Sequence, residues 1–122
     1  MKNKGAAVKF LKLVVAGKID EAYKKYVDMD GVHHNAYVQA GFPALQKAMK
    51  ENHLEFPRKK YKLKNILCEG DLVAAHSSIK LGPKGPDLAV VHIMRFEKGK
   101  IAEFWDCGQQ LPKKSPNRDG AF

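Results

Sequence analysis

The segment 87–110, DLAVVHIMRFEKGKIAEFWDCGQQ, constrains the fold more than any other part of the chain. Its flanks are rich in Val, Ile, Phe and Trp, which pleated strands favour, and its centre, EKGK, is typical of a tight turn. The segment therefore predicts a β-hairpin of two antiparallel strands.

Two registers are open to this hairpin, and they differ in which side chains meet. A two-residue loop sets Met94 opposite Glu103, which leaves a carboxylate beside a thioether. A three-residue loop needs Gly99 in the left-handed conformation, and it pairs Arg95 with Glu103, Met94 with Phe104 and Phe96 with Ala102. Cross-strand pairs of opposite charge or of apolar side chains stabilise a sheet, so we expect the second register.

In this register His92 lies directly opposite Asp106, on a face shared with Val90, Met94 and Phe104. An imidazole and a carboxylate in apolar surroundings can be tuned for proton transfer near neutral pH, because burial and the partner's charge shift a pKa in opposite directions. The alternative is a structural hydrogen bond that only holds the two strands together. The spacing leaves both interpretations open.

The stretches DLVAAHSSIK, VVHIMRFEKGKIAEFWDCGQQLP and NRDGAF resemble the SnoaL-like branch of the nuclear transport factor 2-like superfamily, and the resemblance runs from about residue 26 to the C-terminus. The founding activity of that branch is polyketide ring closure by intramolecular aldol condensation. The resemblance implies that Asp106 acts as acid and base with His92 beside it, and that His34 is a polar pocket group. It also implies a cone-like fold with a ligand cavity between sheet and helices.

Length and composition bound the class of protein. A chain of 122 residues predicts one domain over residues 1–122, and no apolar run reaches the roughly 20 residues of a membrane span. The N-terminal segment has helical spacing and no cleavage site, so we expect a cytoplasmic protein. Cys68 and Cys107 are expected on strands, buried and unpaired, without metal-ligand spacing.

The formal net charge of +9 opens nucleic acid and anionic membranes as partners. The lysines are scattered along the chain, however, and no motif of a nucleic-acid-binding fold accompanies them. We therefore expect neither as a partner.

Helical spacing predicts helices over about 5–16 and 19–27, and a third that opens at 41–43 and ends before Pro57. The segment 28–38 predicts a turn and then a short strand, with His33 and His34 on opposite faces. Further strands are expected over 61–68 and 72–81, before a Gly/Pro-rich loop. Helices first and antiparallel strands last predict an α+β domain, in which three helices pack on the concave face of a curved sheet.

The strand over 72–81 carries His76. If His76 shares the face of His92, the cavity holds both histidines and Asp106, so His76 joins Val90, Met94, Phe104 and His34 as a substrate-binding candidate. These ligand types suit a metal, but they lack a local motif, and we expect no metal or cofactor.

The opposite face of the hairpin carries Val91, Ile93, Trp105 and Cys107, and an apolar face with a tryptophan predicts a homodimer. The tail 111–122 is expected to be irregular, with Phe122 either folded back or frayed.

The leading hypothesis is an enzyme that transfers a proton next to the carbonyl of a small apolar molecule, in an aldol-type cyclisation or an isomerisation. Epoxide hydrolases of the same superfamily use an Asp-Arg-Asp arrangement, and Arg95 is out of phase with His92 for that role. The alternative function is a ligand-binding or accessory module without catalysis.

Overall fold

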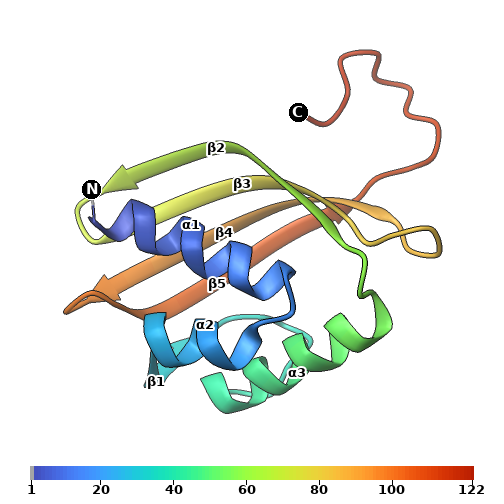
Figure 1. The fold of residues 1–122 in the computed structure, drawn as a ribbon. Coiled ribbons are helices and arrows are strands. Elements are labelled where there is room, and N and C mark those ends of the chain that lie inside the picture. Colours follow the sequence, from blue (N-terminus) through green and yellow to red (C-terminus); the bar gives the residue numbers. More distant parts are fainter. Residues whose placement is uncertain (1) are drawn as a thin grey trace.

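The structure, a computed structural model, describes residues 2–122 as three helices and five strands (Figure 1). The helices are α1 (Lys2–Val15), α2 (Ile19–Tyr26) and α3 (Phe42–Glu55). The strands are β1 (Val27–His33), β2 (Lys60–Glu69), β3 (Leu72–Lys80), β4 (Asp87–Glu97) and β5 (Lys100–Gln110). None of the helices within this described range is long and apolar enough to cross a membrane.

The expected α+β fold is confirmed. The strands form one curved sheet in the order β1-β5-β4-β3-β2, and every neighbouring pair is antiparallel except β1 with β5 (Figure 1). The helices cover one side of this sheet, which we call the inner face, and the other side is the outer face. Residues of one strand alternate between the two faces, so the register decides which side chains reach the helices.

The β4–β5 hairpin reaches the expected register by a different route. Lys98 and Gly99 form a two-residue loop, both with positive φ (51° and 80°), as the twist of a tight hairpin favours. The extra residue is instead a bulge at Ala102, so Phe96 pairs with Ile101 and the predicted pair of Phe96 with Ala102 is wrong. The pairs beyond the bulge are confirmed: Arg95 with Glu103, Met94 with Phe104 and His92 with Asp106.

An aromatic core fixes the helices on the inner face. The ring of Phe10 meets those of Tyr23 and Phe104 edge to face at centroid distances of 5.6 Å and 6.1 Å, and Tyr23 meets Phe42 at 6.2 Å. All four side chains are buried. Such contacts add to the stabilisation from apolar burial, and here they join all three helices to β5.

Strand β1 begins where the sequence predicted a turn. Its turn-forming residues lie within an irregular strand, in which the register shifts between Val27 and Val32, and Asp28 Oδ1 accepts a hydrogen bond from the Asp30 backbone N–H at 3.0 Å. A Cβ atom on Gly31 would lie 2.2 Å from the carbonyl oxygen of Ala102. Glycine is therefore required where β1 runs beside the bulge of β5.

Two further expectations need correction or completion. Cys68 and Cys107 lie on strands and are free, as predicted, but both are exposed and not buried. The tail after Gln110 has no helix or strand, and Phe122 folds back onto His76 of β3, with the ring centroids 5.4 Å apart. The Lys64 ammonium lies 5.2 Å from the same Phe122 ring.

Candidate functional site

A cavity of about 380 Å³ lies between α1, α3 and the inner face of the sheet. Most of its wall is apolar. Its polar side chains are those of Asn35, Tyr37, Asn52, Lys59, Tyr61, His92 and Asp106. Hydrogen bonds define two groups among them: Asn35 contacts Asp106, opposite His92, and Lys59 contacts Asn52. A mostly apolar cavity with a few polar groups is typical of a small-molecule site.

His92 is buried on the inner face of β4, and its ring lies 5.4 Å from the ring of Phe104. Burial lowers the pKa of His92 to about 4, and the negative charge of Asp106 opposes that shift. The imidazole is therefore neutral at neutral pH. Its Nδ1 atom is buried and has no hydrogen-bond partner among residues 2–122.

Asp106 lines the same cavity from β5, directly opposite His92 in the register, but no hydrogen bond joins the two side chains within the described residues. Its partner is Asn35, whose Nδ2 donates to Asp106 Oδ2 at 3.0 Å. The amide of Asn35 is held in turn, because its Oδ1 accepts the Tyr37 backbone N–H at 2.9 Å. Asn35 thus positions Asp106 and leaves His92 available to a ligand.

Two tyrosines close to these groups stay neutral. Burial raises the pKa of Tyr23, with a further contribution from the charge of Asp106, and its hydroxyl donates to Met49 Sδ at 3.1 Å. Burial also raises the pKa of Tyr61, whose hydroxyl accepts a hydrogen bond from Ser77 at 3.1 Å. Neither tyrosine hydroxyl competes with Asn35 for Asp106 in these contacts.

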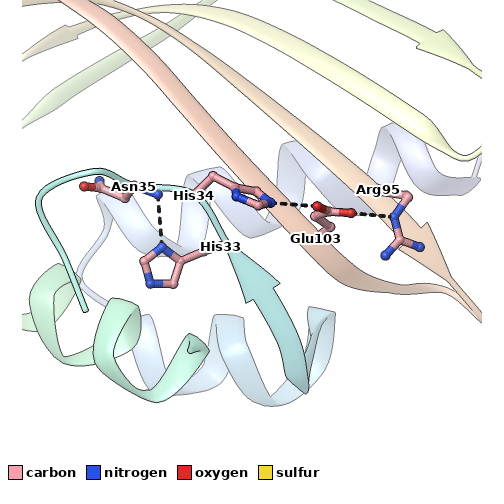
Figure 2. Close-up of polar contacts among 5 residues, drawn as sticks. All are labelled: His33, His34, Asn35, Arg95 and Glu103. Atoms are coloured by element: carbon pink, nitrogen blue, oxygen red, sulfur yellow. Dashed lines mark hydrogen bonds and ion pairs between the residues drawn. The ribbon is translucent and has the colours of Figure 1, made fainter. Parts of the chain in front are cut away.

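The two adjacent histidines that end β1 and begin the next loop point to opposite sides (Figure 2). His33 is buried on the inner side, where its Nε2 lies 2.7 Å from the Gln39 carbonyl oxygen and its Nδ1 accepts the Asn35 backbone N–H at 3.1 Å. His34 lies on the outer face, 2.6 Å from Glu103 and stacked on Trp105 with ring centroids 5.1 Å apart. The prediction that His34 is a pocket group is therefore wrong, because the strand puts His33 inward.

The other predicted site residues are divided among the cavity wall, the buried core and the outer face. Val90 lines the cavity with His92 and Asp106. Met94 and Phe104 share the inner face but belong to the buried core and not to the cavity wall. His76 pairs with Val91 and so lies on the outer face, which makes the prediction of a shared cavity with His92 wrong. Asn35 belongs with His34 to a His-Asn pair that the resemblance to the SnoaL-like branch singles out, but it was not among the predicted site residues, and it is Asn35 that contacts Asp106.

Glu103 and Arg95 join His34 in a polar cluster on the outer face, which we call the outer cluster. Arg95 Nε donates to Glu103 Oε1 at 3.0 Å, while Glu103 Oε2 holds His34 (Figure 2). The hydrogen bonds from His34 and Arg95 lower the pKa of Glu103. His34 directly precedes Asn35, so its contact to Glu103 fixes the chain at the start of the loop that carries Asn35.

Comparisons with known proteins agree on the fold. A family model described as a SnoaL-like domain matches residues 7–104, whereas no curated protein matches the chain. The chain is similar to the solved structure of an NTF-2-like protein of unknown function from Burkholderia xenovorans LB400, with 24% identity, 94% of this chain and 88% of that chain covered, and a TM-score of 0.73.

Two further solved structures carry names that suggest chemistry. For a candidate polyketide cyclase from Bacillus cereus ATCC 10987, the identity is 22%, the coverage is 88% of this chain and 74% of that chain, and the TM-score is 0.76. For an LEH-like epoxide hydrolase from M. tuberculosis, the identity is 17%, the coverage is 86% of this chain and 80% of that chain, and the TM-score is 0.68. At these identities the likeness shows a shared fold alone.

Proposed function

Because this chain belongs to the SnoaL-like domain family, within the nuclear transport factor 2-like superfamily, we propose that its cavity binds a small apolar carbonyl compound and that Asp106 moves a proton next to the carbonyl. One observation carries the proposal. Asp106 and His92 line one apolar cavity side by side, with Asp106 held by Asn35 and His92 without a partner.

The neutral state of the His92 imidazole determines the chemistry. The Asp106 carboxylate takes the proton from the carbon next to the carbonyl, and the electron pair of that C–H bond forms an enolate. Neutral His92 donates an N–H to the developing enolate oxygen. In a cyclisation, the enolate carbon attacks a second carbonyl of the same molecule, which closes a ring and leaves an alkoxide that takes up a proton. In an isomerisation, the enolate is protonated at an atom other than the carbon that lost the proton. Asp106 returns the proton in either case, and no step needs a cofactor.

The surroundings of Asp106 disfavour the Asp-Arg-Asp chemistry of an epoxide hydrolase. Arg95 lies on the outer face, where it contacts Glu103 and Glu97. Lys59 is the one Lys or Arg side chain that lines the cavity within residues 2–122, and it belongs to the other polar group. Asp106 therefore has no arginine beside it to share a bound water.

Hydrogen exchange provides the test, since it needs no knowledge of the complete reaction. Cyclic ketones and polyketide-like carbonyl compounds are incubated with the protein in deuterated water, and loss of the α-proton signals is followed by NMR. We expect wild type to accelerate the exchange of at least one ketone and Asp106→Asn to remove that acceleration. Exchange at the same rate with both proteins, for ketones that demonstrably bind, would exclude Asp106 as the base.

A second candidate function is a binding module without turnover. The missing hydrogen bond between His92 and Asp106 favours it, because a cavity used only for binding needs no coupled pair. In that case Asp106→Asn leaves ligand affinity intact, and there is no exchange activity to lose.

Two further proposals concern the assembly and its compartment. Trp105 and Ile93 are register partners on the outer face, and we propose that a second copy of the chain packs there as a homodimer. Sedimentation of wild type against Ile93→Lys tests this, since the lysine should shift a dimer to monomers. The two exposed free cysteines favour a reducing compartment, so we propose a cytoplasmic location.

A further inference from the structure

Lys59 and Asn52 line the same cavity as Asp106 and His92, and a hydrogen bond makes them a polar group of their own. Lys59 Nζ donates to Asn52 Oδ1 at 3.0 Å and to the Phe56 carbonyl oxygen at 3.4 Å. An ammonium has three N–H donors, so these two neutral acceptors hold the group in place and leave a third donor unused.

Lys59 takes part in no ion pair with residues 2–122. Within residues 2–122, no Asp or Glu oxygen lies within 4.0 Å of its Nζ. Burial lowers the pKa of Lys59, as expected for a cation that has lost part of its water without gaining an anion. A ligand anion would supply the missing charge and form a charge-assisted hydrogen bond.

The sheet register separates this group from the proton-transfer pair. Lys59 directly precedes β2, and Tyr61, the second residue of that strand, pairs with Ile79, which pairs in turn with Leu88. Leu88 precedes His92 by four residues on β4, which is about 13 Å along a strand. The rest of the cavity wall is mostly apolar and includes Val14, Leu45, Ala48, Met49, Leu88 and Val90.

We infer that Lys59, positioned by Asn52, binds a carboxylate at the far end of the ligand, so that the occupant is an elongated carbonyl compound with an acidic group remote from its carbonyl. This inference rests on the proposed function for the carbonyl end. The apolar wall of the cavity fits the hydrocarbon part of such a molecule. Lys59 is then the residue that selects acids over neutral analogues.

A matched pair of ligands tests the inference: a ten-carbon fatty acid with a ketone at its penultimate carbon, and the methyl ester of the same acid. Affinities are measured by NMR titration at neutral pH, with the His92 ring signals as reporter of the carbonyl end. We expect the acid to bind wild type roughly tenfold more tightly than the ester, as one charge-assisted hydrogen bond allows.

Three variants separate Lys59 from the general positive charge of the protein. Lys59→Gln should reduce the ratio of the two affinities to about one, and Lys59→Arg should retain most of it. Lys60→Gln is the control, because Lys60 is an exposed neighbour that does not line the cavity, and it should leave the ratio unchanged.

The outcomes also separate this inference from the proposed function. If acid and ester shift the His92 signals with equal affinity in wild type, the carboxylate site is wrong and the carbonyl site stands. If Lys60→Gln lowers the ratio as much as Lys59→Gln does, the preference is a surface-charge effect and the site is again wrong. If neither ligand perturbs His92, the carbonyl site fails, and the carboxylate site fails with it.

Discussion

Two histidine–carboxylate pairs lie on opposite faces of the same sheet. On the outer face, His34 and Glu103 are 2.6 Å apart, their side chains are 45% and 22% exposed, and Arg95 contacts the same carboxylate. On the inner face, His92 and Asp106 are direct register partners but share no hydrogen bond within the described residues. The residue types are alike, whereas the environments are opposite.

The comparison shows that the better-bonded pair is the structural one. The outer pair is partly exposed to water and its carboxylate also binds Arg95, so its polar groups are already satisfied. The pair holds a loop in place, and a ligand would gain little free energy by binding to it. In the inner pair His92 is desolvated, since burial lowers its pKa to about 4 and leaves its Nδ1 without a partner among residues 2–122. An unsatisfied buried polar group costs free energy, and a ligand that rearranges this site can recover part of it.

The largest effect should come from removing one carboxylate at a time. Asp106→Asn should lower the rate of α-proton exchange by about 10²–10⁴-fold, the usual contribution of a positioned general base. Glu103→Gln should stay within about fivefold, because it weakens only an exposed contact behind the loop of Asn35. Exchange rates measured by NMR in deuterated water decide the matter. Equal losses in the two variants would mean that both pairs act structurally.

The next largest effect should come from β1, the strand that leads into His34 and Asn35. Gly31→Ala places a Cβ atom 2.2 Å from the Ala102 carbonyl oxygen, so we expect the free energy of unfolding to fall by about 3–4 kcal/mol. Urea denaturation measures it. Gly5→Ala is the matched control, because nothing lies within 4 Å of that Cβ and α1 should gain about 0.5–1 kcal/mol. Unchanged stability of Gly31→Ala would contradict the close approach of β1 to β5 at Ala102.

The pH dependence of stability should separate the pairs. The folded pKa of His92, about 4, lies below its ordinary 6.5, so between these values the unfolded chain binds a proton that the folded protein does not. The free energy of unfolding should therefore fall by about 3 kcal/mol as the pH drops from 6.5 to 4. Urea denaturation of His92→Gln should show a flatter profile in this window.

Glu103 provides the contrast within the same experiment. Its pKa is lowered from 4.5, so its contribution to stability is complete above that pH and is lost only as the pH falls below it. Glu103→Gln should leave the profile between pH 6.5 and 4.5 unchanged. If Glu103→Gln flattens the pH profile of the free energy of unfolding in this window as much as His92→Gln does, burial does not distinguish the two pairs.

Much of the fold was predictable because local patterns determine it. Helical spacing and the Gly41-Phe42-Pro43 start placed the helices, and the match of Arg95 with Glu103 fixed the register that sets His92 opposite Asp106. The loop type was wrong because a two-residue loop with a bulge at Ala102 gives the same pairs beyond the bulge as a three-residue loop. Cross-strand pairing alone does not distinguish them.

The rest of the site depends on contacts that no local pattern contains. The faces of His33 and His34 depend on the parallel pairing of β1 with β5, whose register shifts between Val27 and Val32. The face of His76 depends on the register across the irregular loop between β3 and β4, whose length does not determine it. The contact of Asn35 with Asp106 joins residues 71 positions apart in the sequence.

The smallest effect should come from the outer pair itself. His34→Gln removes the stack on Trp105 and weakens the contact to Glu103, and for an exposed pair we expect the free energy of unfolding to fall by about 0.5–1 kcal/mol. Thermal unfolding measures this loss, and the His92 ring signals should keep their pKa, since His92 lies across the sheet. A shifted His92 pKa would show that the outer contacts reach the cavity through Asn35, and the two pairs would then form one coupled unit.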